Sequence, residues 1–326
     1  MSIVIIGAGI AGLAAARELT RLGRSVRLLD KGRGVGGRMA TRRFAGGRFD
    51  TGAQFFSARS RPFRSLLEEE LLPGGAAVEW YRRKEEAYYR GRDGMTAVAK
   101  QLALGLEVEC GVRVVEVTGN REGWSVSGVD SGGAMVTIEA QALLSTAPMP
   151  QTLALLDTVT GELDPQSVAA LREVRYAPTL ALLLLLEGDS PLGPEGYART
   201  GGTLEKIYWL ADNRSKGVSP VGPAITLHAN GAYSRERYDE DDASVVAELE
   251  AAFLDACGGA ARFQVRHRQL KKWRYGRPEN PLPEAASLLS AAPPLAVAGD
   301  AFGGGRVEGA YLSGLAAAEA LHNAIG

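Results

Sequence analysis

Three glycines near the amino terminus, Gly7, Gly9 and Gly12, have the spacing of a turn that binds the phosphates of a dinucleotide. They directly follow an apolar run, Ile3 to Ile6, that is typical of a buried strand. Gly7 permits the tight turn, Gly9 lets a pyrophosphate approach the backbone, and Gly12 lets the next helix pack closely on the sheet. The start of that helix would offer free N–H groups and a partial positive charge to the phosphates.

An acidic residue lies at the position where a dinucleotide-binding turn of this kind requires one. Apolar residues recur at helical spacing from Leu13 to Leu22, Gly23 ends the helix, and a second strand over residues 25–29 leads to Asp30. The Asp30 carboxylate would accept hydrogen bonds from ribose hydroxyls. Strand, helix, strand and acid together predict a dinucleotide-binding unit of Rossmann type.

A second glycine pattern, over residues 32–37, has the same spacing but opens no periodic helix, so we do not interpret it as a second nucleotide site. Enzymes that bind both FAD and NAD(P)H on paired Rossmann domains carry two such units. The two cysteines, Cys110 and Cys257, are far apart and form no CxxC pair. We therefore expect neither a disulfide reductase nor a Cys/His metal centre.

Composition limits the other classes of function. The chain has 326 residues, of which 45% are hydrophobic and 23% charged, and its 37 basic and 38 acidic residues leave a net charge of −1. It lacks the basic excess that nucleic acid or an acidic membrane surface attracts. The longest aliphatic run, Leu180 to Leu186, suits a buried strand and is too short for a membrane span. With no recognisable leader segment and no disulfide framework, we expect a cytoplasmic protein.

Periodicity and turn residues predict the remaining elements. In the first half we expect a helix over residues 62–72, another over 94–104, a strand over 107–117, a hairpin over 124–139 and a returning strand over 142–146. The character changes after Pro150, where we expect strands near Leu180, Ile207, Ala224 and Val265, and a helix capped by residues 239–242 that ends at Ala256. A strand over 295–300 and a helix from Gly309 onward complete the chain.

Four segments resemble the spaced motifs of the flavin amine oxidase superfamily and, more narrowly, those of the bacterial renalases. They are Asp30-Lys31 with Gly36-Gly37-Arg38-Met39, then Asp50-Thr51-Gly52-Ala53-Gln54-Phe55-Phe56, then Trp209 to Lys216, and Gly299-Asp300 with Gly305 to Gly314. The resemblance covers nearly the whole chain. It implies an α/β fold (α+β overall): a Rossmann-type FAD-binding domain with an inserted antiparallel-sheet substrate domain, as in p-hydroxybenzoate hydroxylase and amine-oxidase-type flavoproteins. On this basis residues 1–58, 94–150 and 291–326 form the FAD-binding domain, and residues 59–93 and 151–290 form the substrate domain.

The resemblance also assigns cofactor contacts. Arg38 would reach the phosphates of FAD, Ala53 and Gln54 would lie along the isoalloxazine, Val114 would contact adenine, and Asp300 would bind the ribityl chain. The helix that opens near Val307 and Glu308 would direct its N–H groups toward the flavin. The expected FAD-binding set is Gly7, Gly9, Ala11, Gly12, Asp30, Lys31, Gly37, Arg38, Ala53, Gln54, Val114, Asp300, Val307 and Glu308. Since residues 299–314 contain no Cys or His, the FAD should be noncovalent.

The resemblance implies an FAD-dependent oxidase that takes hydride from 2- or 6-dihydro-NAD(P) isomers, yields NAD(P)+ and passes electrons to O2 to form hydrogen peroxide. No general base is needed, because the departing hydride leaves an aromatic pyridinium. An amine oxidase and a noncatalytic flavin-binding protein remain as alternatives. The residues nominated for stacking and polar contact with substrate are Trp209, His228, Asn230, Trp273 and Tyr275, with Asn213, Arg214 and Lys216 for its phosphate or ribose.

Overall fold

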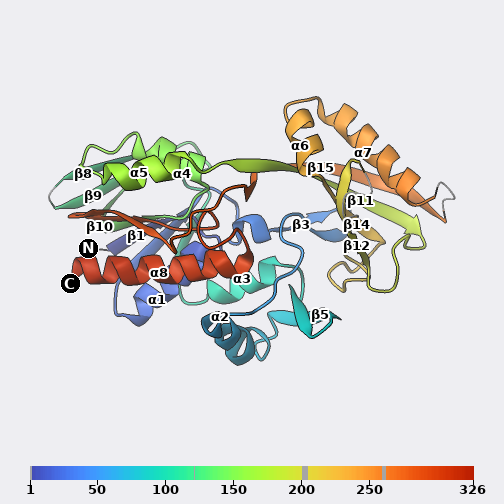
Figure 1. The fold of residues 1–326 in the computed structure, drawn as a ribbon, viewed down its shortest axis with the longest axis horizontal. Helices are drawn as coiled ribbons and strands as arrows, with labels where there is room; N and C mark the ends of the chain where they lie inside the picture. Colours follow the sequence, from blue (N-terminus) through green and yellow to red (C-terminus); the bar gives the residue numbers. More distant parts are fainter. Residues whose placement is uncertain (1, 121, 200–204, 259–261) are drawn as a thin grey trace.

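Two β-sheets, connected by long strands, form the frame of the molecule (Figure 1). The computed structural model describes residues 2–120, 122–199, 205–258 and 262–326. The first sheet has the strand order β16-β17-β10-β1-β2-β7, with β9 beside β10 and β8 beside β9. Its strands are β1 (Ser2–Ile6), β2 (Val26–Asp30), β7 (Glu107–Cys110), β8 (Arg113–Asn120), β9 (Gly123–Val129), β10 (Met135–Ser145), β16 (Ser287–Ala291) and β17 (Pro294–Val297).

The second sheet is antiparallel and has the order β12-β13-β14-β11-β15. Two hairpins form separate two-stranded sheets that are not hydrogen-bonded into either large sheet. The strands of the second sheet are β11 (Tyr176–Gly188), β12 (Tyr197–Arg199), β13 (Ile207–Asp212), β14 (Ala224–Ala229) and β15 (Phe263–Pro278), and those of the hairpins are β3 (Thr41–Phe44), β4 (Gly47–Asp50), β5 (Ala77–Arg83) and β6 (Glu86–Gly91).

Helices cover both sheets. They are α1 (Ile10–Arg21), α2 (Arg61–Leu66), α3 (Thr96–Leu102), α4 (Met149–Leu156), α5 (Pro165–Arg172), α6 (Gly231–Arg237), α7 (Asp242–Ala256) and α8 (Val307–Ile325), with a 3₁₀ turn η1 (Gly37–Met39) and a π-helical turn η2 (Leu67–Leu71). Within the described residues, no helix is long and apolar enough to cross a membrane.

The first sheet has the Rossmann arrangement that the sequence predicts. β1 pairs in parallel with β2 and with β10, and β10 pairs in parallel with β17. On one face, α1 and α8 pack against Ile3 and Ile5 of β1; on the other, α4 and α5 pack against Val4 and Ile6 (Figure 1). Because β1 and β17 are covered on both faces, Ile3 to Ile6 and Pro294 to Val297 form unbroken apolar runs. The predicted βαβ unit, hairpin and α/β fold class are confirmed.

Two pairs of helical segments, α2 with η2 and α4 with α5, pack on the first sheet, although the predicted boundaries assign nearly all of their residues to the substrate domain. Phe63 of α2 and Leu71 of η2 belong to the apolar cluster that contains Ile3, and Leu156 of α4 and Leu171 of α5 belong to the cluster that contains Val4. By contact, these helices cover the first sheet rather than the substrate sheet. The composition changes at Pro150, but the chain leaves the first sheet only where β11 begins. The single strand expected over residues 107–117 is divided into β7 and β8, because Gly111 turns the chain with φ 82°.

The second sheet has two different faces. Paired residues of neighbouring strands point to the same side, and the pairs Leu182–Leu227 and Leu182–Leu270 define an outer face that packs on α7. The pairs Ala181–His228, Trp209–His228, Ala181–Lys271 and Thr179–Trp273 define the opposite side, here called the inner face. At its far end the inner face is covered by Phe44 and Phe49 of the β3–β4 hairpin, which contact Leu183 and Ala224. Trp209, His228 and Trp273 therefore share the surface that is turned toward the first half of the chain.

Candidate active site

The glycine turn after β1 leaves an anion-binding edge open. Gly7 has φ 107° and donates its N–H to Leu29 O, which continues the pairing of β1 with β2 up to the turn. A Cβ on Gly9 would meet no atom within 4 Å, whereas a Cβ on Gly12 would lie 1.9 Å from Gly7 O. The first intrahelical bond runs from Leu13 N to Gly9 O, so the N–H groups of residues 10–12 have no intrahelical partner in the described part of the chain and can face a ligand. The open space and the free donors fit a pyrophosphate, as expected for FAD.

The other end of the chain supplies a second opening of the same kind. α8 begins after Arg306 without a side-chain cap, and its first bond runs from Ala310 N to Arg306 O. The N–H groups at Val307 and Glu308 thus precede the helical bonds. The Glu308 side chain is directed elsewhere: its Oε1 accepts hydrogen bonds from Arg59 N at 3.0 Å and Ser60 N at 2.6 Å. Glu308 can therefore contribute backbone to a flavin site while its carboxylate holds the start of α2.

Asp30 lies at the carboxyl end of β2, where the fold places a ribose-binding acid. Its carboxylate accepts hydrogen bonds from Ala8 N at 2.7 Å and Gly32 N at 2.6 Å, which leaves lone pairs for further donors. Lys31 is exposed and donates to Gln151 Oε1 at 2.9 Å. Val114 is half-buried on β8, two residues after Val112, whose N–H bonds Asp30 O. The predicted adenosine contacts therefore lie at one edge of the sheet.

Arg38 and Asp300 bind each other. The guanidinium donates two hydrogen bonds to the carboxylate, at 2.5 and 2.7 Å, and a third to Tyr275 O at 3.1 Å. The Tyr176 hydroxyl donates to Asp300 at 3.0 Å; burial, and next the negative charge of Asp300, raise the pKa of Tyr176 and keep that hydroxyl protonated. The two residues that the sequence assigns to separate parts of FAD thus form one ion pair. It connects the η1 turn, the end of β17 and both long strands of the second sheet.

The loop that follows β4 is fixed from both halves of the molecule. Ala53 N donates to Arg38 O, and a Cβ on Gly52 would lie 2.1 Å from the same oxygen. From the inner face, His228 Nε2 lies 3.1 Å and Trp273 Nε1 2.9 Å from the carbonyl oxygen of Thr51. Here residues 51–54 are called the flavin loop, because the family resemblance predicts that the isoalloxazine lies along Ala53 and Gln54.

Gln54 carries an unpaired acceptor within this loop. Its Nε2 donates to Asp50 O at 2.5 Å and Gly52 O at 3.2 Å, while its buried Oε1 has no partner among the described residues. A buried amide oxygen without a donor costs about 1–3 kcal/mol. A flavin ring, which carries an N–H donor, fits that need. The residues present at the flavin loop therefore suit the cofactor.

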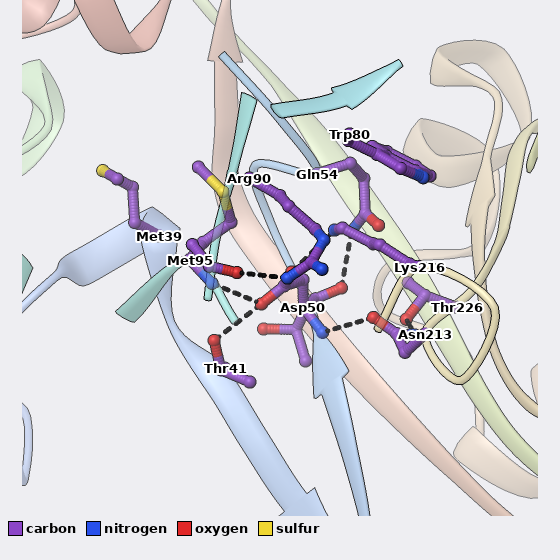
Figure 2. A network of polar contacts seen from close by, with 12 residues as sticks. Met39, Thr41, Asp50, Gln54, Trp80, Arg90, Met95, Asn213, Lys216 and Thr226 are labelled. Carbon is purple, nitrogen blue, oxygen red and sulfur yellow. Dashed lines mark hydrogen bonds and ion pairs between the residues drawn. The ribbon is translucent and has the colours of Figure 1, made fainter. Parts of the chain in front are cut away.

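Behind the flavin loop lies a buried ion pair between Asp50 and Lys216 (Figure 2). Both side chains are 0% exposed, and Lys216 Nζ lies 2.6 Å from Asp50 Oδ2. The other carboxylate oxygen accepts from Thr41 Oγ1 at 2.6 Å and Met95 N at 2.8 Å. Lys216 Nζ also lies 4.9 Å from the centre of the Trp80 ring. We call this group of contacts the buried junction, because it joins β4, the β5 strand and the segment after β13.

Asn213 belongs to the same junction. Its Oδ1 accepts from Asp50 N at 3.1 Å, and its Nδ2 donates to Ala224 O and to Thr226 Oγ1, both at 2.9 Å (Figure 2). Asn213 and Lys216 are 0% and 1% exposed, so both side chains are committed to protein partners. The substrate contact that the sequence analysis gave them is not available in this structure. Their polar character instead serves to connect the second sheet to β4.

The remaining residues that the sequence analysis proposed for substrate contact fall into two groups: some lie at the candidate site, and others have only local structural roles. His228 and Trp273 are half-buried, while Trp209 is almost fully buried on the inner face. Tyr275 packs edge-on against Tyr176 beside the Arg38 ion pair. Asn230 caps α6 by accepting from Tyr233 N and also bonds Glu205 O, and Arg214 donates to Pro220 O on the surface. Asn230 and Arg214 therefore have local structural roles.

His228 is a neutral imidazole. Burial is the main cause that lowers its pKa from 6.5 to about 4; the hydrogen bond with the Thr51 carbonyl offsets part of this effect, and the positive charge of Lys216 adds a smaller decrease. Because Thr51 O can only accept, Nε2 carries the proton and Nδ1 remains an acceptor. His228 can orient a donor group but does not supply a cation at neutral pH.

Sequence reasoning missed an aromatic group around Trp209. Tyr197 stacks on Trp209 with ring centres 5.2 Å apart, and Phe55 lies 5.5 Å from the same ring. The indole Nε1 of Trp209 is buried without a partner among the described residues. The sequence feature that could have revealed this group is the high aromatic content of residues 80–89, which belong to the β5–β6 hairpin. We call this set the aromatic cluster: Phe55, Trp80, Tyr81, Tyr88, Tyr197 and Trp209.

Replacement of Lys216 tests the buried junction. We expect Lys216→Met to lower the free energy of unfolding by about 3–5 kcal/mol, because Asp50 is left charged and buried. Lys206→Met breaks the half-exposed pair with Glu248 and should cost about 1 kcal/mol or less. Denaturant unfolding measures both. Equal costs for the two variants would contradict the junction, whereas partial recovery in Asp50→Asn/Lys216→Met would support it.

Replacement of Arg38 tests the cofactor site. Arg38→Ala should raise the dissociation constant for FAD about tenfold or more, since a charged donor is lost and Asp300 loses its partner. Titration of flavin-stripped protein with FAD measures the effect. Arg64→Ala, an exposed position on α2, is the control and should leave the affinity unchanged. An unchanged FAD affinity in Arg38→Ala would reduce Arg38 to a loop contact.

Acid should destabilise the protein through His228. Its pKa is depressed in the folded state, so its contribution is complete above the unfolded pKa of 6.5 and is lost as pH falls toward 4. Between pH 7 and 4.5 this amounts to about 2 kcal/mol. His228→Gln should therefore show a shallower loss of unfolding free energy over this range. Parallel curves for the two proteins would show that His228 is not held neutral.

Comparisons with known proteins agree with this arrangement. Residues 5–69 match the NAD(P)-binding Rossmann-like domain, and residues 75–322 match the flavin containing amine oxidoreductase family. A Mycobacterium tuberculosis protein named as a flavin-containing monoamine oxidase, AofH, is 29% identical over 189 residues, which are 54% of this chain and 40% of that protein. An acetone monooxygenase of a Gordonia species is 31% identical over 149 residues, which are 44% of this chain and 25% of the enzyme.

Each of these matches spans less than half the length of the curated relative. Among solved structures, a redesigned triple mutant of putrescine oxidase superposes with a TM-score of 0.73 over 99% of this chain and 98% of that one, at 15% identity. At that identity the likeness shows the fold. The family match covers well over half of the sequence and includes the inner face and the start of α8. The chain therefore belongs to the flavin-containing amine oxidoreductase family and has an FAD-binding domain of Rossmann type.

Proposed function

We propose that this protein oxidises the 2- and 6-dihydro isomers of NAD(P) to NAD(P)+. FAD, when bound, accepts the hydride and passes two electrons to O2, which with one solvent proton yields hydrogen peroxide. Two features support this substrate class: the renalase-like sequence segments and the chemistry of the inner face.

The renalase-like segment from Trp209 to Lys216 runs between the two parts of the candidate site. It begins at Trp209 on the inner face and ends at Lys216 in the buried junction. The residues that resemble renalases therefore include those that hold the inner face against the flavin loop. This supports a site built for the same class of substrate.

The observation that carries the proposal is the chemical character of the inner face. This face presents the indole rings of Trp209 and Trp273, the neutral His228 and the cation Lys271, and none of these four side chains is a carboxylate. A dihydropyridine needs no base, because loss of hydride restores an aromatic pyridinium. Trp273 offers a flat surface for such a ring, and His228 Nδ1 is an acceptor suited to the carboxamide N–H of nicotinamide.

An amine oxidase is the alternative, and the aromatic cluster favours it. Aromatic faces attract amine cations, and the Mycobacterium tuberculosis relative and putrescine oxidase are both named for amine substrates. One feature weighs against it. Lys216 already places its ammonium over Trp80, so this ring of the aromatic cluster holds a cation of the protein itself.

Anaerobic stopped-flow mixing separates these functions. Purified protein is mixed with 2-dihydro-NADP, 6-dihydro-NADP, ordinary 4-dihydro NADPH, and a panel of primary amines and polyamines, and flavin absorbance is recorded. We expect rapid bleaching by the two isomers with formation of NADP+, and slow or no bleaching by 4-dihydro NADPH, whose reactive carbon is displaced from near-contact geometry.

Rapid bleaching by an amine while the isomers are inert would contradict the proposal and support the amine oxidase. If no donor bleaches the flavin, a noncatalytic flavin-binding role is supported. Admission of air after bleaching should restore the oxidised spectrum with one hydrogen peroxide per flavin.

A further inference from the structure

Lys271 is an unmatched cation on the inner face. The cations on the outer face of the same strand, β15, have carboxylate partners: Arg268 pairs with Glu250, Lys272 with Asp242 and Arg274 with Asp239. Lys271 points the other way, beside Ala181, and has no carboxylate partner among the described residues. Its Nζ lies 4.5 Å from the centre of the Trp273 ring. A half-buried ammonium held next to the candidate substrate surface is costly unless an anion binds there.

A second unmatched cation faces it from the β3–β4 hairpin. Phe44 of β3 packs against the inner face, with its ring 6.2 Å from that of His267 on β15. Arg42 precedes Phe44 by two residues and so lies on the same side of β3. Arg42 is half-buried and has no carboxylate partner in the described part of the chain. The hairpin thus places a guanidinium along the inner face on the side of Lys271.

The electrostatics of Lys271 agree with this placement. Burial lowers its pKa, and the positive charges of Arg42 and next Lys31 lower it further. Like charges at short range repel each other, so they persist in a fold only where another interaction compensates. A bound anion is the simplest compensation.

We infer that Lys271 and Arg42 form a subsite for the phosphate groups of the dinucleotide substrate. The inference rests on the proposed function and adds a specificity element to it. A planar guanidinium binds two phosphate oxygens at once, and a lysine adds a point charge on a flexible stem. Lys271 Nζ lies over the Trp273 ring, 4.5 Å from its centre. A nicotinamide ring on the other face of that indole would place the pyrophosphate, which is joined to it through a ribose, toward the two cations.

Two variants with matched controls test the subsite. Lys271→Gln and Arg42→Gln remove the proposed contacts. Lys272→Gln and Arg43→Gln remove the same charge at the next residue, which faces the outer side of β15 or lies exposed on β3. Each protein is assayed with the 2- and 6-dihydro isomers of NADP and with the same isomers of nicotinamide riboside, which carry no phosphate. Binding of NADP+ to the oxidised protein is measured separately by calorimetry.

We expect Lys271→Gln and Arg42→Gln each to raise KM for the dinucleotide isomers about tenfold or more, because a charge-assisted bond to phosphate is lost. The kcat, the KM for the riboside isomers and the flavin content should stay within about twofold of the wild-type values, and the control variants should match wild type throughout. The dissociation constant for NADP+ should rise in parallel with KM. Added salt should raise KM for the dinucleotide and leave that for the riboside unchanged.

Equal losses with the riboside would overturn the subsite, because the cations would then act on the nicotinamide end. Loss of flavin would overturn it in favour of contacts to FAD. If no dihydro isomer reduces the wild-type flavin, the proposed function fails. The subsite is then judged by NADP+ binding alone, and it fails as well if Lys271→Gln and Lys272→Gln bind NADP+ with equal affinity.

Discussion

The buried ion pair between Lys216 and Asp50 determines how the second sheet meets the flavin loop. Transfer of two charges out of water costs several kcal/mol for each ion, which only close geometry and further hydrogen bonds offset. Asp50 receives those bonds from Thr41, Met95 and Lys216, and Asn213 holds its backbone. Any shift of the second sheet would break this set together. The inner face is therefore held in one position relative to residues 51–54.

A second group of polar contacts, around Arg38 and Asp300, fixes the other side of the site. The ion pair of Arg38 with Asp300, and the hydrogen bond from Tyr176, join the η1 turn, the segment after β17 and β11. His228 and Trp273 of the inner face both form hydrogen bonds with the Thr51 carbonyl. The residues involved come from the beginning, middle and end of the chain. This explains why an FAD-binding domain assembled from separate stretches of sequence can present one continuous surface to a ligand.

Local chemistry made the first part of the site predictable from sequence. The glycine turn, the acid at the end of β2 and the uncapped helix start require only short-range backbone geometry. The outcome for Asn213 and Lys216 depended on long-range packing. Only the fold shows that Asp50, 166 residues from Lys216, accepts a hydrogen bond from Lys216 Nζ and donates its N–H to Asn213 Oδ1. The pairing of Arg38 with Asp300 and the packing of α4 and α5 on the first sheet depend on the same kind of distant contact. Alternation did predict the strands that carry Trp209, His228 and Trp273, but not that register places them on one face.

The most direct test of this account is a crystal structure of the FAD-bound protein soaked with NADP+. The account predicts the nicotinamide ring between the flavin and the inner face, within contact of Trp273 and His228. Phosphate oxygens should lie within hydrogen-bond distance of Lys271 or Arg42, and the ion pair between Lys216 and Asp50 should be intact. Density for NADP+ away from the inner face, or an inner face filled by the aromatic cluster with no room beside the flavin, would contradict it.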